Sequence, residues 1–133
     1  MFDDNDPLLA KVRGICETFP QSTEQISHGR PVFRASEKGK IYLVYGGGEK
    51  IRPGEMRRHN HAVIFLPDPS DHEALSQDGR FFVPAYFGPS GWLAIDVDHS
   101  DVDWQEITEL VDASYRQIAR KGLIVELDAA TDH

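Results

Sequence analysis

The sequence predicts a two-layer α+β protein, in which an antiparallel sheet of about five strands carries helices on one face. Apolar residues alternate with a period of two between residues 28 and 66, as in strands, and follow helical spacing near both ends of the chain. The predicted strands are clustered and joined by gaps of hairpin length, which favours antiparallel pairing. The expected order of elements is α-β-β-β-α-β-β-α.

The first helix is predicted to begin after Asp6, a good capping residue, because Pro7 suits the first helical position. Pro20 ends this helix. Cys16 falls on its apolar face, so we expect a buried structural thiol rather than a reactive one. As the single cysteine of the chain, it cannot form an internal disulfide.

Three strands are predicted next, at residues 31–35, 41–45 and 61–66. Gly46-Gly47-Gly48 is expected to end the second strand, since glycine weakens strand interiors. The polar segment 49–58 is predicted to form a long loop or the tip of an extended hairpin.

The next part of the chain is predicted to hold a short helix and two further strands. Asp68 begins the helix, which runs through Leu75. The strands lie at residues 81–83 and 92–97, on either side of an aromatic loop.

The last predicted helix is long and amphipathic. Ser100 or Asp101 caps it, and Gly122 ends it. Residues 123–127 are expected to add an edge strand or to pack as a tail, and residues 129–133 are expected to fray.

One face of the sheet is left without helices. It carries either Trp92, Ala94 and Asp96 or the alternate residues Leu93, Ile95 and Val97. Either set leaves apolar area to be covered, so a homodimer or a protein partner is one expected use of this face.

The chain has 133 residues, a size expected of one domain spanning residues 1–133. No apolar run approaches the roughly 20 residues of a membrane helix. The N-terminal residues are acidic and lack the apolar core of a secretory signal. We therefore expect a cytoplasmic protein with no membrane association.

Four motifs occur in the order and spacing of the MmcQ/YjbR family, a largely uncharacterised group of small bacterial proteins. They are Ser27-His28-Gly29-Arg30-Pro31-Val32-Phe33-Arg34, residues 78–86, Gly91-Trp92 and Ser114-Tyr115-Arg116. The chain resembles this family from about residue 6 to residue 122. Members commonly have a lysine at the end of the third strand, where this chain has Leu66-Pro67, so no role of that lysine transfers.

The resemblance implies a two-layer α+β fold, similar to the frataxin/CyaY fold and the secretion-chaperone fold. It also implies a role in DNA binding, which rests on an analogy between this fold and a double-wing arrangement.

The net charge of −8 argues against a protein that coats nucleic acid without specificity. Residues 28–60 nevertheless contain eight basic and three acidic residues. Solvation of exposed strands is the simpler explanation of this excess. The candidates for phosphate contact are Lys50, Arg52, Arg57 and Arg58. The glycine triplet lacks the spacing of a phosphate-binding loop and is interpreted as a flexible hairpin turn.

His59 and His61 are expected on one strand face, because side chains alternate along a strand. Such a pair could begin a metal site that His28 or Glu55 completes. Surface histidines are the simpler interpretation, since the sequence fixes no third ligand. The aromatic run of Phe81, Phe82, Tyr86, Phe87 and Trp92 could stack on bases or line a pocket, although packing against the sheet explains it more simply.

The sequence contains neither a GxSxG nor an HExxH motif, and we expect a non-enzymatic protein without a cofactor. Three functions remain open. They are nucleic-acid binding through the basic segment, protein binding or self-association through the uncovered sheet face, and binding of a small molecule or metal near His59 and His61.

Overall fold

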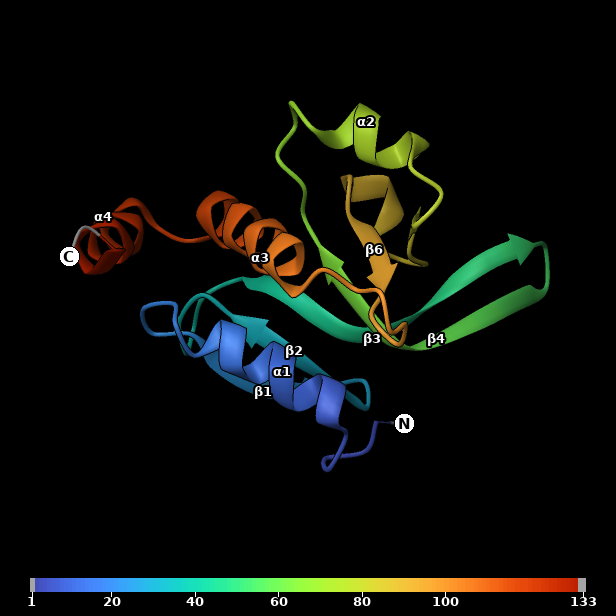
Figure 1. The fold of residues 1–133 in the computed structure, drawn as a ribbon, viewed down its shortest axis with the longest axis horizontal. Coiled ribbons are helices and arrows are strands. Elements are labelled where there is room, and N and C mark those ends of the chain that lie inside the picture. Colours follow the sequence, from blue (N-terminus) through green and yellow to red (C-terminus); the bar gives the residue numbers. More distant parts are fainter. Residues whose placement is uncertain (1, 132–133) are drawn as a thin grey trace.

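The computed structural model describes residues 2–131 and confirms an α+β fold with an antiparallel sheet (Figure 1). Six strands follow the order β1-β2-β3-β4-β6-β5, and every neighbouring pair is antiparallel. The strands are β1 (Thr23–Ser27), β2 (Arg30–Arg34), β3 (Ile41–Arg52), β4 (Glu55–Phe65), β5 (Phe81–Phe82) and β6 (Leu93–Asp96). The helices are α1 (Pro7–Cys16), α2 (His72–Gln77), α3 (Trp104–Ile118) and α4 (Lys121–Thr131), with a 3-10 turn η1 (Gly88–Ser90).

The helices share one face of the sheet, as predicted, and α1 and α3 lie across it (Figure 1). The buried cluster between these layers includes Leu9 and Val12 of α1, Ile107 and Val111 of α3, and Leu43, Phe65 and Leu93 of the sheet. α2 adds Leu75, and α4 adds Leu123 and Leu127. Cys16 belongs to the same cluster, which confirms a buried thiol.

One buried hydroxyl ties α3 to two strands. Ser114 Oγ donates to the Tyr42 carbonyl (2.6 Å) and accepts from the Leu66 amide (2.9 Å). Beside it, the Tyr115 hydroxyl donates to the Pro20 carbonyl (2.8 Å). The Ser114-Tyr115 part of the last motif therefore has a structural role, because it fastens the long helix to the sheet.

The second face of the sheet carries Trp92 and Ala94, whereas Leu93 and Ile95 belong to the helix side. A smaller cluster forms there from Val32, Val44, Ile64 and Ala94. Phe87 and Trp92, with ring centroids 5.7 Å apart, pack against this cluster. The loop between β5 and β6 thus covers part of the face that has no helix.

β1 is a strand that the sequence analysis did not predict. It pairs with β2 through a two-residue turn, in which His28 and Gly29 both have positive φ (52° and 78°), as tight hairpins require. The prediction missed this strand because residues 23–27 include a single aliphatic side chain, Ile26.

The glycine triplet does not end β3, and that prediction was wrong. The strand continues through Gly47 and Gly48, which pair with β4, and the extended hairpin is confirmed. A Cβ at these two glycines would approach Ile64 and Met56. Glycine is present here because neighbouring side chains occupy the space beside the backbone.

Two predicted helix starts were also wrong. Asp68 closes a local turn, and α2 begins only at His72. The cap of α3 is Asp103, not Ser100 or Asp101, because the Asp103 carboxylate accepts from the first free amides of the helix.

The apolar run 123–127 does not form an edge strand, and it packs against the core, as the alternative prediction stated. It lies within α4, which contains Gly122, so this glycine does not end a helix. The two leucines of the run are four residues apart and face the core together. α4 also includes residues 129–131, for which fraying was predicted, and residues 132–133 lie outside the described part of the chain.

Candidate functional site

β3 and β4 project beyond the other strands as a long two-stranded wing, which we define as residues 47–59 (Figure 1). Its register pairs Gly48 with Arg58, Glu49 with Arg57, Lys50 with Met56 and Arg52 with Glu55. Residues directly opposite each other in an antiparallel pair share a face. Lys50 and Arg58 therefore lie on one face of the wing, and Arg57 lies on the other, opposite Glu49.

The four predicted phosphate-binding residues also differ in their partners. Arg52 Nε lies 2.9 Å from Glu55 Oε2, so this guanidinium is already paired. Lys50 and Arg58 make no ion pair within residues 2–131 and have no carboxylate opposite them. Of the four candidates, Lys50 and Arg58 therefore lie on the same face of the wing, and neither has a carboxylate opposite it to balance its charge.

A cavity of about 380 Å³, here called the cationic cavity, opens where the wing joins the sheet. Three basic residues, His28, Arg30 and Arg58, line it together with the Asn60 amide. The rest of its wall comes from Phe2, Tyr45 and glycines 29, 46 and 47, so no described lining residue carries a carboxylate. This composition suits an anion.

Arg30 directly follows the tight turn between β1 and β2, and its guanidinium lies beside Gly47 of β3. A Cβ at Gly47 would lie 3.7 Å from Arg30 Nη1 and only 2.5 Å from Ile64 Cδ1. The close contact is thus with Ile64, and the guanidinium lies at an ordinary van der Waals distance from this position. Within the described residues, the Arg30 side chain is half-buried and makes no ion pair or hydrogen bond.

A second cavity, of about 490 Å³ and here called the apolar cavity, shares His28 and Arg30 with the first. Its other lining residues are Ser27, Val32, Ile41 and Val44 from the sheet, and Tyr86 and Phe87 from the loop after β5. The Ala85 amide donates to the Gly48 carbonyl (2.8 Å), so this loop is fastened directly to the wing.

Tyr86 is the exposed member of the aromatic run, with 86% of its surface accessible and a positive φ of 73°. The other four aromatic residues pack as the simpler interpretation predicted. Phe81 lies against Phe65, Phe82 stacks on His59, and Phe87 and Trp92 contact each other.

Sequence reasoning considered His28 only as a possible metal ligand and Tyr86 only as one of five aromatic residues, for which packing was the preferred interpretation, and it did not select Arg30 as a site residue. Both His28 and Arg30 lie in the first family motif, which was the available signal. Nothing local to Tyr86 distinguishes it from the aromatic residues around it.

His59 and His61 do not share a face, so that expectation was wrong. His59 Nδ1 lies 2.9 Å from both Asp96 oxygens, and its Nε2 lies 3.0 Å from Glu49 Oε1, on the side of the sheet without helices. β4 is irregular between them: Val63 pairs with Tyr45 but His59 pairs with Gly47. In the part of the chain that the structure describes, no group of three or more metal-ligating side chains could hold an ion.

His61 instead belongs to a partly buried polar cluster on the helix side. Asp6 Oδ2 accepts from the Tyr45 hydroxyl (2.7 Å) and lies 2.8 Å from His61 Nδ1, while Asp6 Oδ1 accepts from the Leu8 amide as the cap of α1. Burial raises the pKa of Asp6, but the bonds from Tyr45 and Leu8 and the charge on His61 outweigh it and hold the pKa below its ordinary value. Burial and the neighbouring Asp6 raise the pKa of Tyr45.

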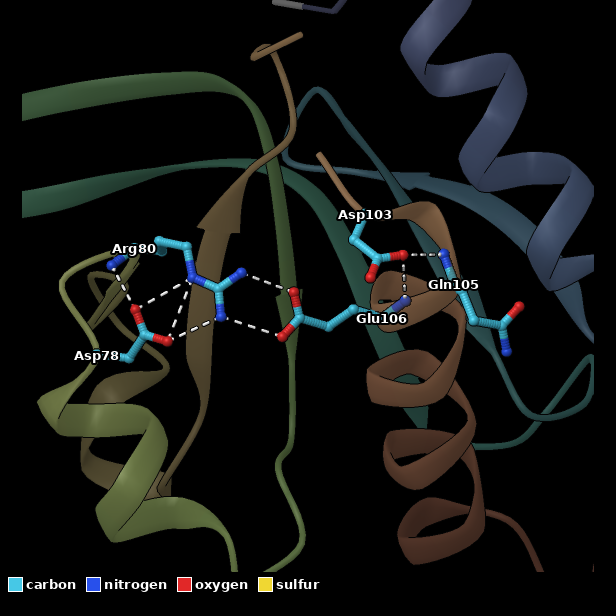
Figure 2. Close-up of polar contacts among 5 residues, drawn as sticks. All are labelled: Asp78, Arg80, Asp103, Gln105 and Glu106. Carbon is cyan, nitrogen blue, oxygen red and sulfur yellow. Dashed lines mark hydrogen bonds and ion pairs between the residues drawn. The ribbon is translucent and has the colours of Figure 1, made fainter. Parts of the chain in front are cut away.

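The acidic residues near the start of α3 have structural partners as well. Figure 2 shows Arg80 between two carboxylates: its Nη1 lies 2.7 Å from Glu106 Oε1, and its Nη2 lies 2.8 Å from Asp78 Oδ2. Asp103 accepts from the amides of Gln105 and Glu106. Arg80 thus fastens the turn before β5 to the first turn of α3.

The comparisons with known proteins agree with this fold. A family model described as YjbR matches residues 17–117. The crystal structure of the Deinococcus radiodurans protein DR2400, with the family-model domain DUF419, is similar at a TM-score of 0.64 and 19% identity over 86% of this chain and 80% of that chain. No curated protein matches the sequence. No helix among the described residues is long and apolar enough to cross a membrane. The YjbR match covers most of the chain and agrees with the resemblance that its motifs indicated, so the chain belongs to the YjbR family.

Proposed function

We propose that the protein binds nucleic acid through its phosphate groups, at the cationic cavity and along the adjoining face of the wing. The observation that carries this proposal is the composition of the cavity: His28, Arg30 and Arg58 line it, and no described carboxylate does. The two guanidinium groups have no ion-pair partner within residues 2–131, so their charge is available to a ligand.

Arginine suits this task because its planar group donates two parallel hydrogen bonds to phosphate oxygens. Lys50 extends the same charge along the wing, since it lies on the face of Arg58. Contacts of this kind fix a protein on a sugar-phosphate backbone without selecting bases. The net charge of −8 confines binding to this surface, because the rest of the protein repels a polyanion.

The test is fluorescence anisotropy of labelled single-stranded and duplex DNA, titrated with protein at low and near-physiological salt. With Arg30, Arg58 and Lys50 on three phosphates, the logarithm of the binding constant for a single strand should fall with the logarithm of salt concentration at a slope of about −2. Arg58→Ala should weaken binding to DNA of any sequence. It should also reduce the salt slope by the contribution of about one phosphate contact.

Arg57→Ala is the matched control. It removes the same charge from the adjacent residue, but Arg57 lies on the opposite face of the wing and across from Glu49. Both arginines are exposed, so both variants should fold like the wild type, which circular dichroism can check. Equal losses in the two variants, or no binding by the wild type at low salt, would contradict the proposal.

A further inference from the structure

The cationic cavity and the apolar cavity adjoin each other, and their polarities differ. Arg30 and His28 line both. On one side of this pair lie Arg58 and Asn60, and on the other lie Val32, Val44 and the aromatic residues of the loop. A nucleotide has the same division, because its phosphate is an anion and its base offers two flat apolar faces.

Tyr86 is held at the mouth of the apolar cavity at a cost to the fold. A bulky residue with positive φ is strained. Because the Tyr86 residue is 86% exposed, burial of its side chain contributes almost no stabilisation to offset this strain. The conformation is nevertheless built into the loop. The Ala85 amide bonds to Gly48, the Gly88 amide donates to the Pro84 carbonyl (2.9 Å), and a Cβ at Gly88 would lie 2.4 Å from Val83.

Phe87 supplies the inner wall of the same cavity, and Trp92 supports it from behind. Aromatic side chains beside a basic groove are the usual platform for unstacked bases, since every base has a face on which to stack. The strain at Tyr86 and the aromatic wall are thus both explained by one occupant.

We infer that the apolar cavity receives an unstacked base of a single strand, stacked on Tyr86 and against Phe87, while Arg30 binds the phosphate next to it. This inference rests on the proposed function and specifies its ligand. A duplex cannot fill the apolar cavity without first breaking a base pair, so single strands bind more tightly. An apolar peptide segment or the apolar face of a second copy of the chain would cover the apolar residues but would leave the charge of Arg30 without a partner.

The experiment compares three labelled ligands of equal length in anisotropy titrations: an intact single strand, an abasic strand with the same phosphates, and a duplex. The intact strand should bind the wild type about tenfold more tightly than the abasic strand, which is the size of one base-stacking contact. Tyr86→Ala should remove this difference by weakening only the intact strand, and Tyr86→Phe should retain it. Arg58→Ala should weaken both single strands.

A second readout uses Trp92, which lies behind Phe87, in a Trp104→Phe background that leaves Trp92 as the single indole of the chain. Its fluorescence should change on addition of the intact strand but not of the abasic strand. Titration with a nucleoside monophosphate shows whether one nucleotide is sufficient. Its saturation would assign the site to free nucleotides and overturn the strand specificity if longer strands bind no better.

The outcomes separate the two proposals. Equal binding of intact and abasic strands, with loss in Arg58→Ala, would overturn the base pocket and leave phosphate binding in place. Absence of binding by all three ligands at low salt would overturn both. Tyr86→Ala that weakens intact and abasic strands equally would also contradict the inference, because the residue would then act through the structure of the loop.

Discussion

Arg30 Nη1 lies 3.7 Å from the point at which a Cβ of Gly47 would stand. The guanidinium of a β2 residue thus extends over the backbone of β3 at a position where the chain has no side chain. The same point lies 2.5 Å from Ile64 Cδ1, and Ile64 is fully buried. The absence of a side chain at Gly47 is therefore required by the packing of Ile64, beside which the Arg30 guanidinium lies.

Gly47→Ala should lower the free energy of unfolding by about 1–3 kcal/mol, because an added methyl group overpacks a buried contact. Gly14→Ala is the control: a Cβ there meets nothing within 4 Å, and the residue lies inside α1. It should raise stability by about 0.5–1 kcal/mol in urea denaturation. A Gly47→Ala protein as stable as the wild type would contradict the close packing.

The backbone strain at Tyr86 can be tested by comparing the stability of two variants, Tyr86→Gly and Tyr86→Ala. At its positive φ, glycine is free of the steric cost that alanine retains. Tyr86→Gly should therefore be more stable than Tyr86→Ala by about 1 kcal/mol, the reverse of the order in helices or strands. Thermal or urea unfolding of both variants measures it. Equal stability, or a more stable alanine variant, would show that the loop relaxes.

Asp6 should make the stability of the protein depend on pH on the acid side. The pKa of its carboxyl is lower in the folded state than the value of about 4 in the unfolded chain. Its stabilising contribution is therefore complete above about pH 4 and is lost as the pH falls through the lower folded pKa.

Asp6→Asn keeps a capping oxygen but loses the charge that Tyr45 and His61 contact, and should cost about 1–2 kcal/mol at neutral pH. The difference between this variant and the wild type, followed by urea denaturation from neutral to acid pH, should shrink below pH 4. A difference that does not change with pH would argue against an ionised Asp6 in the folded state.

Cys16 should be unreactive in the folded protein. Burial raises the pKa of its thiol to about 12, although the nearby Tyr42 hydroxyl acts in the opposite direction, so almost no thiolate exists at neutral pH. A thiol reagent such as DTNB should react only after denaturant is added, in proportion to unfolding. Rapid labelling of the native protein would mean that α1 opens readily.

Ser114→Ala should cost about 1–3 kcal/mol, because it removes the buried hydrogen bond to the Tyr42 carbonyl and leaves the half-buried Leu66 amide without its acceptor. Ser76→Ala is a control of the same chemistry on an exposed helix surface, where the hydroxyl bonds the His72 carbonyl. It should change stability by less than about 0.5 kcal/mol in urea denaturation. Similar effects at the two serines would remove the special role given to Ser114.

The sequence was sufficient for the class of fold, because alternation and helical spacing are local patterns. The alternation around Leu43 and Val63 predicted strands, and the apolar spacing of α1 and α3 predicted helices. The course of β3 through Gly47 was not predictable in the same way, since the side chains that fill the space beside it come from β2 and β4.

The candidate site was predicted in part. Lys50 and Arg58 could be named as cations, but their common face depends on a register between β3 and β4 that residue types do not encode. The shared face of His59 and His61 failed for the same reason, since alternation holds only in a regular strand. Self-association through the sheet face and a cytoplasmic location stay predictions.

The hydrogen bond from the Ala85 amide to the Gly48 carbonyl distinguishes the base of the wing from its tip. A two-stranded ribbon alone is marginally stable, but a third segment of chain clamps this one at Gly48. Arg58, opposite Gly48, therefore lies at this point of attachment, whereas Lys50 lies beyond it, toward the tip of the hairpin. We therefore expect Arg58 to hold a more fixed position than Lys50. The base of the hairpin would then set the position of a bound ligand, and the residues at the tip would adjust to it.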